Sequence, residues 1–594
     1  MLAMALALAA GLPGGTALAQ QVAVDDLAPP SRSELLPPEV QPDQRRSTLT
    51  VEGGLERGPC ALDDPSMAAI RVTLTSVNFT GAEAAGDVDL TQAYQPYLGR
   101  ELPLSVLCDI RARASEALSR AGYLAAVEIP EQRLAGGAAE LRVVIGRLTA
   151  VRVRGDAGGA QAVLERYLQH LVNQPVFNVN EAERYLLLAD DIPGLDVRLS
   201  LRAAVNGQPG DLIGEIAAIS QPAQVSFNLQ NLGSRELGRF GGTLGAQVYG
   251  LTGLGDVTSI SLFSSHDFAE QQTVQLAHEF LAGGDGLKLG GQITLGWAHP
   301  TLDLPGFDVK AQTLFTTLRA SYPLVRTQRQ TIALATGLDL VNQDVKANAF
   351  LLSRDHVRVA WLRLDGSKTD RASLLREGGY SPYEPRFRLT YGIEARQGLS
   401  IFNANPDCRQ SLAACTSANL LPSRAEQDPT ATLLRADLAA EFRPVPTFTI
   451  ALRAVAQGTD DPLPAFEELT GGNYSIGRGY DPGAITGDRG LSGSLEFRLG
   501  SLIPRGTDAW AFQPFAFVDA SRVKDLDPSQ LALNPDSLAS VGGGIRFAWA
   551  RGMQGDLSLA VPLHNTDTRA LNGRPRGDVR VLFSITSRLL PWGF

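Results

Sequence analysis

Residues 387–396 read Phe-Arg-Leu-Thr-Tyr-Gly-Ile-Glu-Ala-Arg, and their alternation of apolar and polar side chains decides the fold class. Successive side chains of a β-strand point to opposite faces of its sheet. One face of this stretch carries the apolar Leu389, Tyr391, Ile393 and Ala395, and the other carries Arg388, Thr390, Glu394 and Arg396. The same period of two returns at 494–499 and 579–589. Each stretch is therefore predicted to be a strand with one apolar and one charged face.

A soluble β-sandwich also alternates in this way, so the pattern alone does not identify a membrane protein. Three further features favour a barrel. The strand pattern runs from residue 222 to 594 without a helical stretch, and its polar face carries charges of both signs. Short turns alternate with long connections such as 403–429. These features are typical of a transmembrane antiparallel β-barrel with a wet interior, which we predict over 222–594.

Residues 60–220 mix helical and strand periods. The expected order of strand, helix, helix, strand, strand occurs first at 70–79, 89–98, 103–121, 124–130 and 140–145. It then recurs at 148–154, 160–172, 179–189, 195–203 and 212–219. We therefore predict two tandem α/β domains, at 60–146 and 147–221, in front of the barrel.

The first 59 residues suggest export followed by a linker. An apolar run at 2–12 precedes Ala17-Leu18-Ala19, which fits a signal-peptidase site, so residues 1–19 are predicted to be a signal peptide. The alternative is a buried core helix. Residues 20–59 are rich in proline and charge and are interpreted as a linker. Only 31–36 could be helical there, as a short plug segment.

Composition and cysteines narrow the class further. The net charge of −10 argues against nucleic acid as a partner, because phosphates need a basic surface. The four cysteines suit an oxidising compartment and allow three disulfide connectivities, of which Cys60–Cys108 with Cys408–Cys415 is the simplest. Two isolated pairs without flanking histidines do not provide four convergent metal ligands, so no metal and no cofactor is expected.

Several motifs resemble one family. Arg478-Gly479-Tyr480 matches the VRGY/F loop motif, and Phe515-Ala516-Phe517-Val518-Asp519 matches the FxFxD strand motif, of the Omp85 superfamily. With 231–234 and the α/β pair, the chain from about residue 60 resembles the two-partner secretion transporters of the ShlB/FhaC/HecB type. The resemblance implies two POTRA domains, a barrel of 16 strands, and a loop at about 471–493 that folds back into the lumen.

The two motifs also make physical sense together. Phe515, Phe517 and Asp519 share one strand face, and a carboxylate should not face lipid, so all three are expected in the lumen. The resemblance implies that Arg478 pairs with Asp519 over the two rings. Alternatively, Arg478 is a solvated loop residue and Asp519 has other partners. The pair could also act as a purely structural clasp instead of a gate.

The C-terminus bears on insertion. Pro591 lacks a backbone N–H and should end the last strand near Leu590, and the terminal Phe594 resembles the signal read by the barrel-insertion machinery. From the resemblance we expect a monomer in outer-membrane lipid, with its POTRA domains in the periplasm, and that machinery as a partner during insertion.

The expected function is secretion, without enzyme activity. The POTRA domains would bind a large unfolded exoprotein by strand addition to an exposed sheet edge at 195–219, and the barrel would conduct it outward. An assembly factor of the same superfamily is the first alternative, although its relatives usually carry three or more POTRA domains. A passive porin or receptor is the second, although a diffusion pore needs no protein-binding arm.

Overall fold

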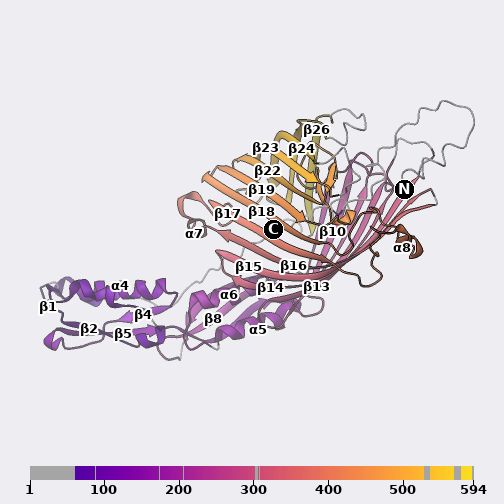
Figure 1. The fold of residues 1–594 in the computed structure, drawn as a ribbon. Coiled ribbons are helices and arrows are strands. Elements are labelled where there is room, and N and C mark those ends of the chain that lie inside the picture. The colour runs from indigo at the N-terminus through magenta and orange to yellow at the C-terminus, as the bar shows by residue number, and fades with distance from the viewer. Residues whose placement is uncertain are drawn as a thin grey trace, which may run out of the picture.

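The computed structural model describes residues 32, 60–67, 69–86, 88–172, 174–204, 207–301, 306, 308–348, 350–526, 535–566 and 577–590. Two α/β domains follow one another and lead to a closed barrel (Figure 1). The predicted signal peptide, the predicted linker apart from Arg32, and Phe594 lie outside the described residues.

The barrel is one closed sheet in which each strand pairs antiparallel with its neighbours and β26 closes on β9. Its sixteen strands, counted in the described residues, are β9 (Ala223–Gln230), β10 (Gly241–Tyr249), β11 (Val257–Ser265), β12 (Gln271–Ala282), β13 (Leu287–Ala298), β14 (Val309–Arg326), β15 (Gln330–Ala347), β16 (Phe350–Thr369), β17 (Phe387–Gly398), β18 (Thr432–Val445), β19 (Phe448–Thr459), β22 (Arg489–Leu499), β23 (Trp510–Lys524), β24 (Asp536–Trp549), β25 (Met553–Pro562) and β26 (Arg580–Leu590). The predicted antiparallel barrel is confirmed.

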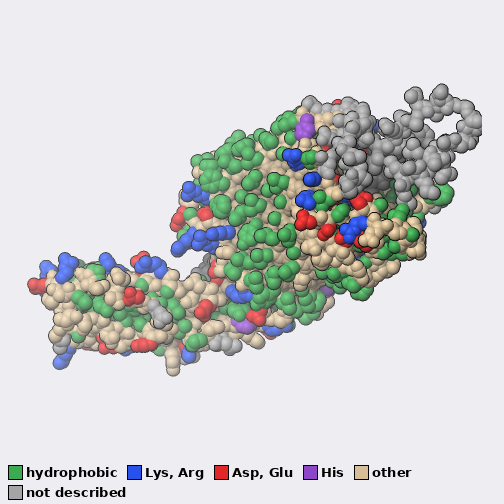
Figure 2. Space-filling model, viewed as in Figure 1, with side chains coloured by type: hydrophobic (Ala, Val, Ile, Leu, Met, Phe, Trp, Pro, Cys, Tyr) green, Lys and Arg blue, Asp and Glu red, His purple; other side chains and the backbone are tan. Residues whose placement is uncertain are grey.

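The two faces of the barrel wall differ as the period of two requires. Along β23 the exposed and buried side chains alternate without a break, with Phe512 and Val518 outside and Asp519 inside. Apolar side chains cover much of the outer wall in Figure 2. None of the helices in the described part of the chain is long and apolar enough to cross a membrane.

The first α/β domain contains one sheet in the order β2-β5-β4 and a separate pair, β1-β3. Its main elements are β1 (Arg71–Thr73), β2 (Ser76–Thr80), α3 (Thr91–Tyr94), β3 (Glu101–Pro103), α4 (Val106–Arg120), β4 (Ala125–Glu128) and β5 (Ala138–Ile145). The apolar face of α4 fills the core through Leu107, Ile110, Ala114 and Leu118. The prediction of one strand at 70–79 was wrong, because β1 and β2 pair with different partners.

The second α/β domain has the sheet order β6-β8-β7, with α5 and α6 packed on it. The elements are β6 (Arg147–Asp156), α5 (Gln161–Val172), α6 (Val179–Asp190), β7 (Leu195–Ala203) and β8 (Asp211–Ser220). Because β8 is central, β6 and β7 are the edge strands of this sheet.

The second α/β domain packs against the end of the barrel at which β14 ends and β15 begins. Arg326, at the end of β14, donates from Nε and Nη2 to the two oxygens of Asp191, over 2.6 and 2.7 Å. Leu281 of β12 is buried in the apolar core of this domain. Gly159 contacts the turn after β10 so closely that a Cβ there would lie 1.9 Å from the Gly250 carbonyl oxygen. The barrel and this domain therefore share one interface.

Candidate functional site

The connection between β19 and β22, residues 460–488, folds into the barrel lumen. It contains a small hairpin, β20 (Leu469–Gly471) paired with β21 (Ile485–Gly487). An apolar cluster joins this loop to the wall strands β23 and β24, and it consists of Leu469, Tyr480, Ile485, Val523 and Leu538. The loop starts and ends earlier than the predicted 471–493, because β22 already begins at Arg489.

Arg478 and Asp519 are in direct contact. The side chain of Arg478 donates from Nε and Nη2 to the two Asp519 oxygens, over 2.9 and 2.8 Å. Its backbone N–H donates to the same carboxylate over 3.0 Å. Only 1% of the Asp519 side chain is exposed. The carboxylate is thus held by a paired, charge-assisted arrangement largely shielded from water.

Two further partners of Arg478 were not singled out in the sequence. Its Nη1 donates to Glu496 over 2.9 Å, and its Nη2 donates to the Ser494 hydroxyl over 3.0 Å. Arg546 of β24 donates to both oxygens of Glu496. Ser494 and Glu496 lie on the polar face of the 494–499 stretch, so the alternation of the sequence indicated that both face the lumen. It did not indicate that either would bind Arg478.

Gly479 and Tyr480, which follow Arg478 in the motif, hold the loop against the barrel wall through close packing and hydrogen bonds. The Tyr480 hydroxyl lies 2.9 Å from the carbonyl oxygen of Ala539 and 2.7 Å from that of His564. Gly479 packs so tightly that a Cβ would lie 2.7 Å from the Cβ of Ser540, while its N–H donates to the Ser540 hydroxyl. A side chain at this position would push the loop away from the wall.

A second charged cluster joins the same loop to the wall strands β15 and β17. Arg396 of β17 donates to Asp339 and to Glu467, and all three side chains are 2% exposed. Arg32, a helical residue of the N-terminal segment, lies 3.5 Å from each of these two carboxylates. It also lies over the rings of Phe315 and Phe466. Arg32 therefore lies in the lumen, beside the lumenal loop.

A third cluster stands at the far rim of the barrel. Arg424, from the long connection after β17, binds Glu468 and Asp488 over 2.7 Å each and also pairs with Asp525. Burial raises the pKa of Glu468 to about 8, because the pairing with Arg424 is outweighed by burial and by the other two carboxylates. The guanidinium joins two long loops and the end of β23.

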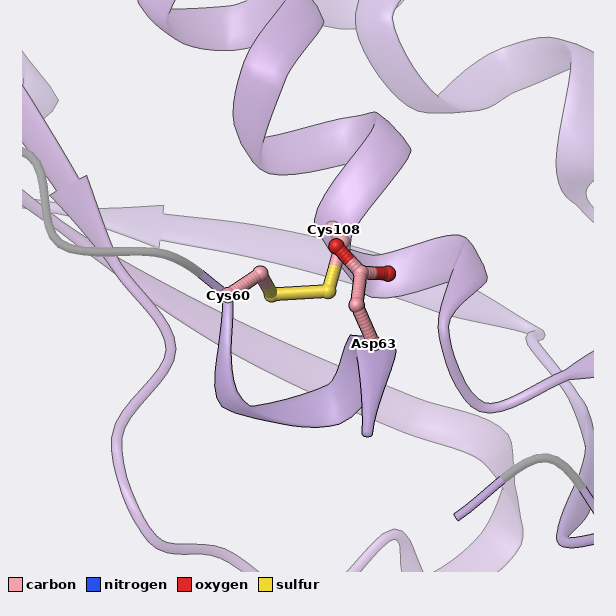
Figure 3. A group of neighbouring side chains, drawn as sticks. All are labelled: Cys60, Asp63 and Cys108. Carbon is pink, nitrogen blue, oxygen red and sulfur yellow. A yellow bond between two sulfur atoms is a disulfide. The ribbon is translucent and has the colours of Figure 1, made fainter. Parts of the chain in front are cut away.

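Both predicted disulfides form. Cys60 is bonded to Cys108 at the start of α4, with Asp63 beside the bond (Figure 3). Cys408 is bonded to Cys415 within the long connection after β17. In the described residues two groups could converge on a metal: Cys60, Asp63 and Cys108, and Glu468, Asp488 and Asp525. The sulfurs of the first are bonded to each other, and Arg424 binds the carboxylates of the second.

Comparisons with protein families match the barrel and the first α/β domain. Residues 217–547 match the family model described as haemolysin secretion/activation protein ShlB/FhaC/HecB. Residues 72–146 match the POTRA domain of ShlB type. The heme/hemopexin transporter protein HuxB of Haemophilus influenzae is 23% identical over 484 residues, which cover 80% of this chain and 81% of that protein.

Solved structures agree on the fold. CdiB from Escherichia coli superimposes with a TM-score of 0.68 at 17% identity, and 95% of each chain is covered. CdiB from Acinetobacter baumannii gives 0.60 at 16% identity, with the same coverage. At these identities the likeness concerns the arrangement of the α/β domains and the barrel.

Proposed function

The chain belongs to the haemolysin secretion/activation protein family ShlB/FhaC/HecB, the outer-membrane transporters of two-partner secretion, and we propose that it binds an unfolded exoprotein through its α/β domains and passes it through the barrel. The first α/β domain is a POTRA domain, the second is proposed to be one, and both would stand in the periplasm. No catalytic role is proposed.

The observation that carries this proposal is a cavity of about 1010 Å³ where the second α/β domain meets the barrel. Its lining comes from both parts, with Leu195 at the start of β7 on one side and Arg326 and Arg388 on the other. Since β7 is an edge strand, an extended segment paired with it would end at this opening. Of the predicted range 195–219, β8 is central, so β7 is the proposed docking edge.

The lumenal loop is proposed to be the gate. Arg478 holds it on β22 and β23, and Glu467, which pairs with Arg396 and faces Arg32, holds it on β17. We expect the loop to narrow the lumen while both of these contacts hold it. We propose that passage displaces Arg32 and breaks the contacts of both Glu467 and Arg478.

The test compares culture supernatants of the wild type and a deletion strain, with the amounts of other outer-membrane proteins measured in parallel. We expect one large secreted protein to disappear from the deletion supernatant while the other barrels stay at normal levels. If the supernatant is unchanged and many barrels fall together, the chain is an assembly factor and the proposal fails. Restoration by the full chain on a plasmid controls for secondary effects.

A further inference from the structure

The lumen wall has two chemically different halves. On β9 to β13 the outward face of each strand is fixed by an exposed apolar side chain, Leu229, Leu244, Ile260, Leu276 and Ile293. The side chains of opposite parity face inward. The hydrogen-bonding ones are Gln224, Ser226, Asn228, Gln230, Thr243, Gln247, Tyr249, Ser259, Ser261, Ser265, Gln271, Thr273, Gln275, Gln292 and Thr294. We call these five strands the neutral wall.

Charge is almost absent from the neutral wall. Its only inward charges in the described strands are Glu279 and Lys288, near the end that meets the second α/β domain. These two lie 3.9 Å apart, and Glu279 also pairs with Arg319 of β14. The charges of Glu279 and Lys288 therefore neutralise each other. The rest of the wall is uncharged and presents hydroxyls, amides, small side chains and a few larger apolar ones such as Val257 and Phe263.

The other half of the lumen is charged and already engaged. Arg363 of β16 binds Asp365, Glu394 and Asp437, which come from three different strands. Glu496 binds Arg546 and Arg498. The lumenal loop lies mainly on this half through Arg478 and Glu467, and it also touches the neutral wall at the end of β9, where Gln230 donates to the Tyr474 hydroxyl over 3.5 Å. A passing chain would have to compete with these ion pairs.

The open space in the barrel follows the neutral wall. A cavity of about 260 Å³ is lined by β9 to β14, including Ser261, Gln275 and Gln292. It shares Gln224, Gln247 and Val257 with the entrance cavity beside β7. The two spaces are therefore continuous, from the edge of the second α/β domain into the lumen along one side.

We propose that the exported polypeptide passes as an extended chain along the neutral wall of β9 to β13, and not along the charged half. This inference rests on the proposed function and adds the path. Hydroxyl and amide side chains both donate and accept hydrogen bonds, so they can match the N–H and C=O groups of any extended backbone. Without unpaired fixed charges, neither acidic nor basic residues of the cargo are retained at one position.

The experiment places a photoreactive amino acid at Ala277 of β12 or at Ala451 of β19, in the full chain and in cells that secrete the partner protein. Both alanines are lumen-facing, by the exposure of Leu276 and Leu452 beside them, and they lie on opposite halves. Ala451 is buried by its neighbours whereas Ala277 is partly exposed, so an adduct from Ala451 would show that the charged half opens during passage. The crosslinked partner to be detected is the protein that is lost from the supernatant of the deletion strain. We expect its adduct from Ala277 and none from Ala451.

An equal or stronger adduct from Ala451, or none from Ala277 while secretion continues, overturns the path and leaves secretion itself intact. If the deletion strain loses no secreted protein, the proposed function fails, and this inference with it. A second measurement uses charge. Ser261→Glu should reduce secretion severalfold at normal barrel levels, whereas Ser261→Thr should not. Equal secretion from both variants also overturns the path.

Discussion

The guanidinium carbon of Arg478 lies 3.4 Å from the centroid of the Phe517 ring. The arginine thus binds Asp519 edge-on and covers the phenyl ring with its face. This explains why aromatic side chains are found inside a wet barrel. The rings at Phe515 and Phe517 are shielded by arginines, since Arg546 lies over Phe515 at 4.4 Å.

Removal of the arginine should be costly. Arg478→Ala leaves a buried Asp519 without its cation, and we expect a loss of about 3–5 kcal/mol in the stability of the barrel. Thermal unfolding in detergent measures this loss. Arg489→Ala is the control, because its partner Asp460 is 99% exposed. An unfolding temperature equal to that of the control would show that Asp519 finds other partners. Normal secretion despite a lower unfolding temperature would identify a clasp without a gating role.

The disulfide of the first α/β domain should stabilise that domain. Cys60 and Cys108 are 48 residues apart, and a loop of this length is worth about 4 kcal/mol in the chain-entropy model. Cys60→Ser should therefore make α4 sensitive to protease in the full-length protein. Cys408→Ser serves as the control, since that disulfide lies in a barrel loop. Equal cleavage of the first α/β domain in both variants contradicts the prediction.

The interface of the second α/β domain depends on Arg326. The bidentate pair with Asp191 is partly exposed, so Arg326→Ala should weaken docking by only about 1–3 kcal/mol. Hydrogen exchange of α6 should become faster while the barrel strands stay protected. Arg329→Ala changes a neighbouring arginine of the same turn and should leave α6 unchanged. Unaltered exchange in Arg326→Ala means that apolar packing alone holds the domain.

The rim cluster should respond to pH. Burial raises the pKa of Glu468 to about 8 from a usual 4.5, so the folded protein binds the proton more tightly than the unfolded chain. The stabilisation is therefore complete below about pH 4.5 and is lost as the pH rises through 8. Unfolding temperatures measured between pH 5 and pH 9 report this loss of stability. In Glu468→Gln the unfolding temperature should no longer fall with pH to the extent that Glu468 contributes. An identical slope in Glu468→Gln contradicts the assignment to this residue.

The period of two predicted the barrel and the inward face of β23 because each strand must separate lipid from water. It could not predict which lumenal charges meet. Arg424 and Asp525 lie 101 residues apart in the chain, and their contact depends on how two loops bend over the rim. Arg326 and Asp191 belong to different domains, so the sequence pattern around one residue gives no information about its contact with the other. The prediction of one strand at 70–79 was wrong for a related reason. Its first part, β1, pairs with β3, and its second part, β2, pairs with β5.

Leu281 has a consequence for biogenesis. A side chain of a barrel strand completes the apolar core of the second α/β domain, together with residues such as Val163 and Ile192. That domain reaches its finished packing only when β12 is in place, so its maturation is coupled to closure of the barrel. A precursor waiting for insertion would present an incomplete apolar patch, which is the kind of surface that chaperones recognise.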